Sequence, residues 1–414
     1  MNQEKATAYQ NHQYISDQSS LQDCCQRLLK TAEINWIAID TEFVRVDTYF
    51  PELSLVQIAD NQGQLFIIDP LEIAADAAYL NVTSAAHATQ AHPLWPLIEV
   101  LKSNHLLKVF HSARQDIEVL YQLAGEMPQN IFDTQIAAIF KGYGDLSGFA
   151  RVIEAELDEK LAKSQTRTNW HARPLTKEQI HYALDDVYYL AKLYQQFANS
   201  LSEDQKNAVF EDCQTLLQTS LYEINPAEAW HRIKGIKGFK PKQLAILQSL
   251  VQWREIKAIE DNEPRKWIAS DEVLVQVCKR PPKTTQALYK VPGIKASTVK
   301  SYGDVWIELI DEVFRLDPKD YPKPPAKLDA ASVQEEIVLQ LLLALCQQVA
   351  LDNQITATNI SNKQTLLEFI RGNSTAVFGW RKQLFYQTAS ELLNNQCQLA
   401  IENGHLHCSP NIKI

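Results

Sequence analysis

The stretch WIAIDTEFV, residues 36–44, constrains this chain most, because two acidic residues follow directly on an apolar segment. Trp36 to Ile39 predict a buried strand, and Asp40 and Glu42 lie at its end. Positions i and i+2 of a strand point to the same face, roughly 7 Å apart. Two carboxylates on one face repel each other and lose hydration, which is costly unless a cation lies between them. Since hard oxygen ligands suit Mg²⁺ or Mn²⁺, the pattern indicates a divalent metal site.

A third carboxylate comes from the segment HSARQDIEVLYQLAG, residues 111–125, which predicts a helix. Asp116 lies in the first turns of this helix, beside its apolar stripe. A carboxylate at a helix N-terminus is also favoured for electrostatic reasons alone, so capping is the alternative for Asp116. The corresponding alternative for the first pair is that Asp40 ends its strand as a turn residue and Glu42 is merely solvated.

A tyrosine and a fourth carboxylate come from the helix predicted over 176–198. Tyr182 and Asp186 are four residues apart, so they lie on one helix face next to the buried stripe. Asp185 is rotated about 100° away from that face. The alternative is a Tyr–Asp pair on the surface.

Four carboxylates in one pocket without a metal would force several of them to become neutral. Two divalent cations about 3.5–4 Å apart would instead make the pocket a two-metal clamp for in-line attack on a phosphodiester. One metal would generate and orient the hydroxide, the second would stabilise the leaving 3′-oxygen, and Tyr182 would orient or deprotonate the attacking water. Neither a Walker-type loop nor a Ser/His/Asp arrangement is visible, so nucleotide hydrolysis and acyl transfer are poorly supported. The predicted metal ligands are Asp40, Glu42, Asp116 and Asp186.

The charge of the chain is unevenly distributed. The whole chain has a net charge of −10, but residues 1–221 carry −13 and residues 222–325 carry +4. Bound divalent cations would offset part of the first deficit. The basic excess of the middle segment suits a phosphate-binding surface, although a solvated basic face is the commoner explanation of such an excess.

Length and cysteine content restrict the class of protein. A chain of 414 residues is long enough for two or three domains. No apolar run approaches the ~18 residues of a membrane span, and the N-terminus has no signal-peptide core, so we expect no membrane association. Seven cysteines without a C-x-x-C pair predict neither a disulfide framework nor a zinc site, and the cytoplasm is the expected compartment.

Alternating strand and helix signals in the first half predict an α/β domain with a mixed sheet, which ends near residue 220. Residues 53–60 and 65–69 predict a β-hairpin, because a glycine-containing turn joins two β-rich runs. Ser112 with Gln115, and Thr176 with Gln179, predict capping boxes. We expect the domains 1–220 (α/β), 221–315 (helical) and 330–400 (helical), a proline-rich linker at 316–329 and a loose tail at 401–414.

Three motifs in order resemble the DEDDy group of 3′–5′ exonucleases: DTE at 40–42, H-x-x-x-x-D at 111–116 and Y-x-x-x-D at 182–186. The longer stretches DTEFVRVDTYFPELSLVQIAD, KVFHSARQDIEVL and KSQTRTNWHARPLTKEQIHYALDDVYYL are similar to the bacterial ribonuclease D family. The resemblance covers about residues 13–200 and implies a ribonuclease-H-like fold. It also implies that the four carboxylates hold the metals and that Tyr182 positions the water.

The middle segment is similar to the helicase-and-RNase-D C-terminal (HRDC) domain, through LAILQSLVQWREIKAIEDNEP (244–264) and LYKVPGIKASTVKSYG (288–303). Residues 330–400 would be a diverged second copy. HRDC domains bind nucleic acid, so the turn at 291–294 is expected to meet a phosphate. The alternative is that this turn only joins two helices. The expected RNA contacts are Thr41, His111, Lys163, Arg167, Arg173, Lys290, Lys295 and Lys300.

Two of these assignments have structural alternatives. His111 can instead be a hydrogen-bonding residue at the end of its strand. Trp170, in the basic loop 161–175, can stack on a base, but packing beneath the loop is the expected role.

The resemblance implies a monomeric, metal-dependent 3′–5′ exoribonuclease that trims tRNA precursors and other small RNAs to release nucleoside 5′-monophosphates. A DNA exonuclease of proofreading or repair type is the alternative, since nothing in the motifs reads a 2′-hydroxyl. A non-catalytic RNA-binding scaffold is the other alternative, and the five filled catalytic positions argue against it.

Overall fold

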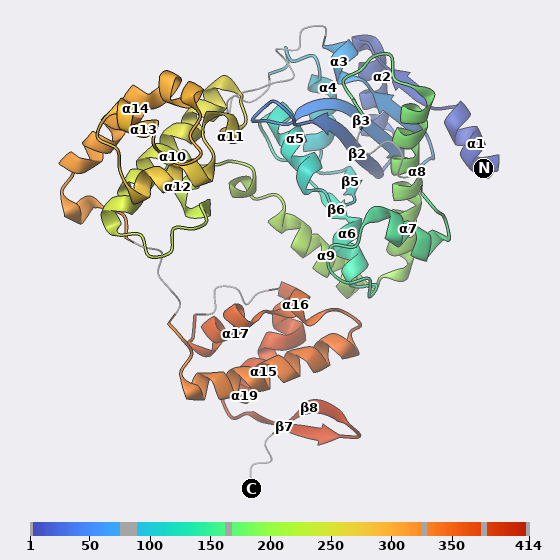
Figure 1. Ribbon diagram of the computed structural model, residues 1–414. Coiled ribbons are helices and arrows are strands. Elements are labelled where there is room, and N and C mark those ends of the chain that lie inside the picture. The colour runs from blue at the N-terminus through green and yellow to red at the C-terminus, as the bar shows by residue number, and fades with distance from the viewer. Residues whose placement is uncertain (1–2, 75–88, 162–167, 324–328, 374–378, 411–414) are drawn as a thin grey trace.

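The computed structural model describes residues 3–74, 89–161, 168–323, 329–373 and 379–410. Figure 1 shows three units: an α/β unit at the upper right, a helical unit at the upper left, and a second helical unit with a small hairpin below. Each unit has its own cluster of buried apolar side chains. None of the helices in these residues combines the length and apolar composition that a membrane-spanning helix needs.

The α/β unit is built on a six-stranded mixed sheet with the order β1-β4-β3-β2-β5-β6. Strand β2 runs antiparallel to β3, and β3 antiparallel to β4, while the other neighbours are parallel. The predicted hairpin and the mixed sheet are therefore confirmed. The strands are β1 (Gln13–Ile15), β2 (Trp36–Val44), β3 (Glu52–Asp60), β4 (Leu65–Ile68), β5 (Leu107–Phe110) and β6 (Ile131–Asp133).

Strand β2 lies inside the sheet and extends beyond the end of its neighbour β5. Its apolar residues Ile37 to Ile39 are fully buried. Of the residues of β2, only Trp36, Ile37 and Ala38 pair with β5. A register shift between Glu42 and Phe43 disturbs the pairing of β2 with β3. The acidic end of β2 therefore has no strand neighbour on the β5 side, which leaves space there for side chains from helices.

Helices cover this sheet, and α8 packs against four of its strands, β2 to β5. The predicted capping box of α8 is confirmed: the Thr176 hydroxyl accepts from the Gln179 backbone N–H, and the Gln179 side chain accepts from the Thr176 N–H. The helices of this unit are α1 (Gln3–Gln10), α2 (Gln18–Lys30), α3 (Pro70–Ile73), α4 (Trp95–Lys102), α5 (Arg114–Ala124), α6 (Thr134–Ile139), α7 (Phe149–Leu157), α8 (Lys177–Ser200) and α9 (Glu203–Thr215).

The capping box predicted for Ser112 and Gln115 is wrong. Helix α5 begins at Arg114 without a side-chain cap, and Ser112 has the left-handed φ of 62°. The carboxylate of Asp133, at the end of β6, takes the place of a local cap. It accepts the backbone N–H groups of Ser112 and Ala113, each at 2.9 Å. A partner about 20 residues away thus fixes the turn that leads into α5.

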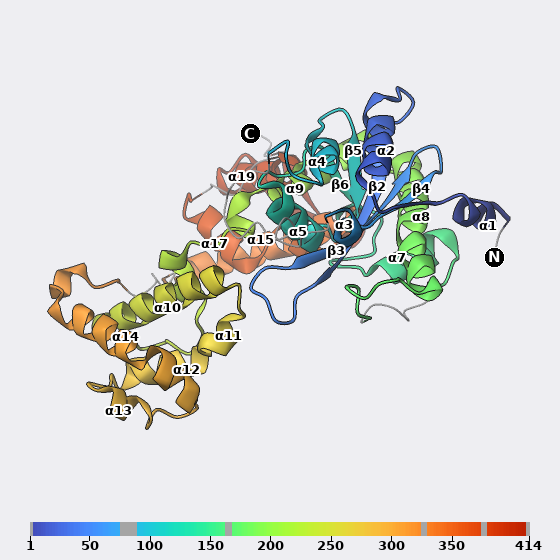
Figure 2. The same cartoon turned by 90° about the horizontal axis from the view of Figure 1, so that it is seen from above.

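The first helical unit packs around Leu247, Leu250 and Trp306, which are buried. Its 3-10 helix η3 (Pro226–Arg232) lies against α10, the longest helix of the unit. In Figure 2 the unit lies to one side of the sheet, with the loop between β2 and β3 pointing toward it. The helices are α10 (Pro241–Asp261), α11 (Arg265–Ile268), α12 (Asp271–Lys279), α13 (Thr285–Leu288) and α14 (Ala296–Arg315).

The second helical unit packs around Leu342 and Phe385 and contacts the α/β unit. The Arg381 guanidinium pairs with the carboxylate of Asp212, at 2.5 and 3.0 Å. The Thr358 hydroxyl donates to Asp145 at 2.7 Å. The helices are α15 (Val333–Asp352), α16 (Ala357–Ile360), α17 (Lys363–Ile370), α18 (Gly379–Arg381) and α19 (Gln387–Leu393), with the π-helical turn η5 (Lys382–Tyr386).

The prediction of a loose tail after residue 400 is wrong. Strands β7 (Cys397–Glu402) and β8 (His405–Pro410) form an antiparallel hairpin that lies against α15. The turn residues Asn403 and Gly404 both have left-handed φ values, 52° and 82°. Asn-Gly is a strong local signal for such a turn, so the sequence contained the information for this hairpin.

Candidate active site

Three carboxylates meet where the acidic end of β2 faces α8. Asp40, Glu42 and Asp186 each offer an oxygen atom, and these atoms lie within 4.8 Å of one another. The first two share one face of β2, and α8 crosses that face, so its inward side carries Asp186 to them. The sequence prediction that these three residues converge is confirmed in its geometry.

The fourth acid lines the same pocket but stands outside the group of three. Asp116 is buried, and the Thr41 hydroxyl donates to its Oδ1 atom at 2.5 Å. Thr41, which lies between Asp40 and Glu42 in the sequence, is itself buried. Its hydroxyl therefore orients Asp116 in this structure, and the RNA contact predicted for Thr41 from the sequence stays a prediction.

Burial and mutual repulsion set the electrostatics of the four acids. Burial, followed by the charges of Asp40 and Asp116, raises the pKa of Glu42 to about 9. Burial and the neighbouring charge of Asp186 raise the pKa of Asp40 well above its ordinary value. The pKa of Asp116 and of Asp186 is raised in the same way, by burial first and by the other acids second.

The donor set fits divalent cations. Within the described ranges, no lysine, arginine or histidine forms an ion pair with any of the four acids, so their charge is not compensated by the protein. All the ligands offered are carboxylate oxygens, the type that Mg²⁺ and Mn²⁺ prefer. A cation at this position would favour the ionised acids and so counteract both the burial and the repulsion that raise the pKa values.

Tyr182 and Asp185, three residues apart on α8, have different surroundings. Tyr182 lines the pocket with Asp186, as its spacing predicts, and its ring packs against Trp170 with centroids 6.1 Å apart. Trp170 is buried, which confirms the packing role expected for it. The Asp185 carboxylate instead pairs with Lys5 and accepts from the Tyr9 hydroxyl, outside the pocket.

His111 is held by hydrogen bonds at the end of β5. Its Nε2 atom lies 3.0 Å from the Ser147 carbonyl oxygen, and its Nδ1 atom lies 2.9 Å from the Thr134 hydroxyl. Burial lowers the pKa of the imidazole. These contacts confirm the alternative role of a hydrogen-bonding residue at the strand end. The side chain also lines the pocket, so the predicted RNA contact stays a prediction.

The position of Arg173 speaks against its predicted RNA contact. Its guanidinium forms two hydrogen bonds to the buried carboxylate of Asp69, at 2.5 and 2.8 Å. It also donates to the Ser54 carbonyl at 2.8 Å and to the Trp170 carbonyl at 2.7 Å. The donors of Arg173 are thus used inside the protein. The other two basic residues predicted in this loop, Lys163 and Arg167, lie outside the described residues.

The three lysines predicted in the first helical unit surround an exposed turn. Lys290 precedes the turn, Lys295 is the N-cap residue of α14, and Lys300 lies in its second turn. All three are exposed, and none forms an ion pair with a residue that the structure describes. Gly293 in this turn has a φ of 82°.

The pocket has a volume of about 270 Å³, and several of its walls were not predicted. The aromatic rings of Phe43 and Phe149 are the most prominent additions, and Phe149 packs against the His111 ring with centroids 5.1 Å apart. No local pattern distinguishes these residues from core aromatics. The lining residues that were not predicted from the sequence are Phe43, Ser112, Gln115, Phe149 and Leu190.

Comparisons with known proteins agree with this arrangement. Residues 12–202 match the 3′–5′ exonuclease domain family, and residues 243–310 match the HRDC domain family. Ribonuclease D of Sphingobium indicum is 32% identical over 403 residues, 96% of this chain and 98% of that protein. Ribonuclease D of Bartonella henselae is 32% identical over 379 residues, 90% of this chain and 88% of that protein.

A solved structure extends the agreement to three dimensions. The crystal structure of Escherichia coli RNase D, an exoribonuclease involved in structured RNA processing, superposes with a TM-score of 0.77 at 28% identity. The superposition covers 93% of this chain and 99% of that chain.

A ribonuclease-H-like mixed sheet with clustered acids at its end, followed by an HRDC domain, defines a 3′–5′ exonuclease. The similarity runs through nearly the whole length of the curated relatives. The chain therefore belongs to the ribonuclease D family of 3′–5′ exoribonucleases, as its motifs predicted.

Proposed function

We propose that this chain removes nucleotides from the 3′ ends of structured RNAs, including tRNA precursors, at the pocket between β2, α5 and α8. The observation that carries the proposal is the meeting of Asp40, Glu42 and Asp186 within 4.8 Å, with Tyr182 in the same pocket. The proposed products are nucleoside 5′-monophosphates. The proposed site residues are Asp40, Glu42, Asp116, Tyr182 and Asp186.

The four acids are proposed to hold two divalent cations, Mg²⁺ or Mn²⁺. When bound, such cations supply an activated hydroxide and stabilise the negative charge of the leaving 3′-oxygen. The protein supplies the ligands in fixed positions: β2 provides Asp40 and Glu42, and α8 provides Asp186. The hydrogen bond from Thr41 holds Asp116 in one orientation, which reduces the reorganisation needed when a cation binds.

Tyr182 is proposed to orient the attacking water through its hydroxyl group. Its ring packs against the buried Trp170, which restricts the positions that the ring can adopt. Helix geometry places the hydroxyl on the side of α8 that carries Asp186. Tyr182 would therefore orient the attacking water by forming a hydrogen bond to it.

The first helical unit is proposed to bind the RNA backbone. The segment 231–242 contains Arg232, Lys234, Lys237, Lys240 and Lys242, which are all exposed. No Asp or Glu occurs from residue 229 to residue 254. None of the five cations forms an ion pair within the described part of the chain, so their charge is available to phosphates. Lys290, Lys295 and Lys300 are proposed to extend this surface.

The unit boundaries support the domain division expected from the sequence, with one change. The buried cluster of the α/β unit extends to Tyr222, and that of the first helical unit runs from Ala229 to Val313. Partly buried residues from Ile224 to Tyr321 pack against the second cluster. We propose domains at 1–220, 221–315 and 330–410, the last being a diverged HRDC domain that includes the terminal hairpin. We also propose that one chain is sufficient for activity, which sedimentation of the active enzyme tests.

Hydrolysis of matched oligonucleotides tests the choice of RNA as substrate. A tRNA precursor with a 3′ trailer and a DNA of the same sequence are incubated with the full chain and Mg²⁺ or Mn²⁺. The proposal predicts that the RNA is shortened stepwise from its 3′ end and that the trailer is lost first. Faster digestion of the DNA would overturn it in favour of a DNA exonuclease.

A further inference from the structure

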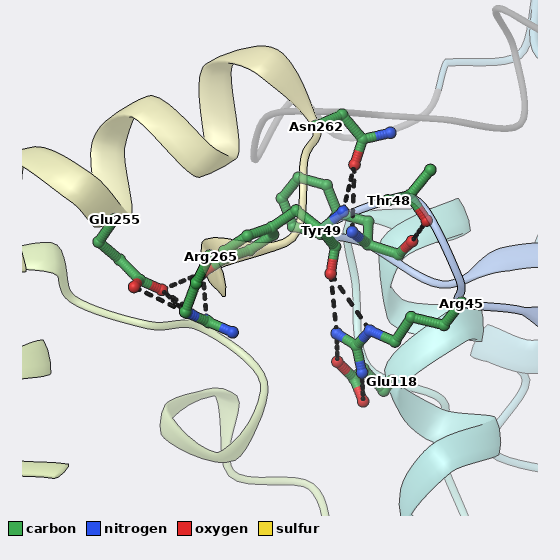
Figure 3. A network of polar contacts seen from close by, with 8 residues as sticks. Arg45, Thr48, Tyr49, Glu118, Glu255, Asn262 and Arg265 are labelled. Carbon is green, nitrogen blue, oxygen red and sulfur yellow. Dashed lines mark hydrogen bonds and ion pairs between the residues drawn. The ribbon is translucent and has the colours of Figure 1, made fainter. Parts of the chain in front are cut away.

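The loop between β2 and β3 connects the catalytic strand to the first helical unit. This loop, residues 45–51, follows Glu42 by only a few residues and reaches α10 (Figure 3). Figures 1 and 2 both show the loop extending from the sheet toward α11 and the end of α10. At its centre Tyr49 is buried, with 6% of its surface exposed.

The side chain of Tyr49 is held by a carboxylate and a guanidinium group of the first helical unit, those of Glu255 and Arg265. Its hydroxyl donates to the Glu255 carboxylate and accepts from Arg265 Nη2 at 2.7 Å. The Arg265 guanidinium also lies over the Tyr49 ring, 4.4 Å from its centroid, and donates from Nε to both Glu255 oxygens at 2.7 Å. Glu255 is almost completely buried, so these contacts compensate its charge.

The backbone of the same loop is fixed by the residue that ends α10. The side-chain oxygen of Asn262 accepts the backbone N–H groups of Tyr49 and Phe50, each at 3.1 Å. Asn262 is the C-cap residue of α10 and has the left-handed φ of 49°. The interface also contains a small cluster of buried apolar side chains, formed by Tyr49, Ala258 and Ile268.

The other side of the loop is tied to the helix that carries Asp116. The Arg45 guanidinium donates to the Tyr49 carbonyl oxygen at 3.1 and 3.2 Å. The same guanidinium pairs with Glu118 of α5 at 2.7 Å. One loop thus connects α10 to β2, which carries Glu42, and to α5, two residues after Asp116.

We infer that Tyr49, with Glu255, Asn262 and Arg265, is a positioning set that holds the first helical unit in register with the catalytic acids, so that RNA bound on this unit places its 3′ end in the pocket. The inference rests on the proposed function. The interface is inferred to position long substrates relative to the catalytic acids. It takes no part in the hydrolysis step itself. A substrate too short to reach the helical unit does not depend on it.

The double variant Tyr49→Phe with Asn262→Gly tests this role. Phenylalanine keeps the ring beneath Arg265 and removes only the hydroxyl, so the Glu255–Arg265 pair remains intact. Glycine accepts the left-handed backbone of position 262 and removes only the side-chain acceptor. Tyr321→Phe is the matched control, because it removes a tyrosine hydroxyl that bonds to Val313 within the first helical unit.

The measurements are kcat and KM for a ribodinucleotide and for a tRNA precursor, with the full chain and saturating Mn²⁺. Thermal unfolding shows whether the fold is retained, and amide hydrogen exchange at residues 49 and 50 reports whether the interface has opened. We expect kcat/KM for the precursor to fall roughly tenfold or more in the double variant, while the dinucleotide values stay unchanged. The control variant is expected to keep both activities.

The possible outcomes separate the two claims. Equal losses on both substrates would overturn the inference, because the interface would then support the fold of the catalytic centre itself. Unchanged activity on the precursor, with faster exchange at residues 49 and 50, would overturn it as well. A wild-type chain that hydrolyses neither substrate would instead overturn the proposed function on which the inference rests.

Discussion

The hydroxyl of Thr41 donates to the carboxylate of Asp116 at 2.5 Å and so joins the catalytic strand β2 to helix α5. Thr41 lies between Asp40 and Glu42 in the sequence, and its neighbour across the hydrogen bond is the fourth acid of the pocket. This bond keeps the Asp116 carboxylate in one orientation although the surrounding acids repel it.

Replacing Thr41 by valine should weaken cation binding while the fold is retained. Valine has nearly the same shape but cannot donate the hydrogen bond, so Asp116 becomes free to rotate. We expect the Mn²⁺ concentration for half-maximal activity to rise about tenfold, the usual cost of losing a residue that orients a metal ligand. Metal titration of RNA hydrolysis measures this. Thr41→Ser keeps the hydroxyl and should stay near wild type; equal effects of both changes would contradict the role.

The same substitution at two neighbouring acids of α8, Asp185 and Asp186, should have different effects on RNA hydrolysis. Asp186→Asn removes a carboxylate from the pocket and is expected to reduce RNA hydrolysis to background. Asp185→Asn changes the contacts with Lys5 and Tyr9 and removes one of the charges that raise the pKa of Asp186, but it leaves all four acids of the pocket in place. It should therefore retain activity and lower the free energy of unfolding by about 1 kcal/mol. Single-turnover rates and urea unfolding compare the two. Loss of activity in the Asp185 variant alone would contradict the site.

The stability of the cation-free protein should fall as the pH rises. The pKa of Glu42 is raised to about 9, whereas its ordinary value is 4.5. The folded chain therefore keeps a proton that the unfolded chain loses between these two values. The stabilisation is complete below about pH 4.5 and is lost as the pH rises through about 9.

Urea unfolding in EDTA and in Mg²⁺, from about pH 5 to about pH 9, measures this dependence. The free energy of unfolding should decrease with pH in EDTA and much less so in Mg²⁺, because a bound cation favours the ionised acids. Identical pH profiles in both conditions would show that the acids do not hold a cation.

Local sequence patterns were sufficient to predict the strand β2 and the helix α8, which carry three of the four acids. The apolar run before Asp40 and the capping box of α8 involve neighbouring residues, so strand, helix and the facing of Asp186 followed from them. The predicted cap at Ser112 failed because its partner, Asp133, comes from another strand. The terminal hairpin was missed although Asn403 and Gly404 signal its turn.

Long-range partners explain the remaining differences. Arg173 was predicted to contact RNA because its partner within the protein could not be recognised from the sequence. That partner, Asp69, lies 104 residues away. The contact between Tyr49 and Asn262 joins residues 213 positions apart, for which the sequence has no local signal. The aromatic walls Phe43 and Phe149 likewise depend on how β2 and α7 approach each other.

Arg173→Met should affect stability and leave RNA affinity unchanged. The change leaves the fully buried Asp69 without its cationic partner, so the free energy of unfolding is expected to fall by about 3 kcal/mol. Lys177→Met, at an exposed position nearby, is the control for loss of one positive charge. Urea unfolding and the salt dependence of RNA binding distinguish the two roles. A weaker salt dependence in the Arg173 variant alone would restore the RNA contact.

The most direct test of the proposed site follows a 5′-labelled RNA during incubation with wild-type chain or Asp40→Ala, each with Mg²⁺ and with EDTA. We predict stepwise shortening from the 3′ end by the wild type in Mg²⁺ only, with RNA binding retained but no shortening by the variant. Equal hydrolysis by the variant, or by the wild type in EDTA, would contradict catalysis by cations held at these carboxylates.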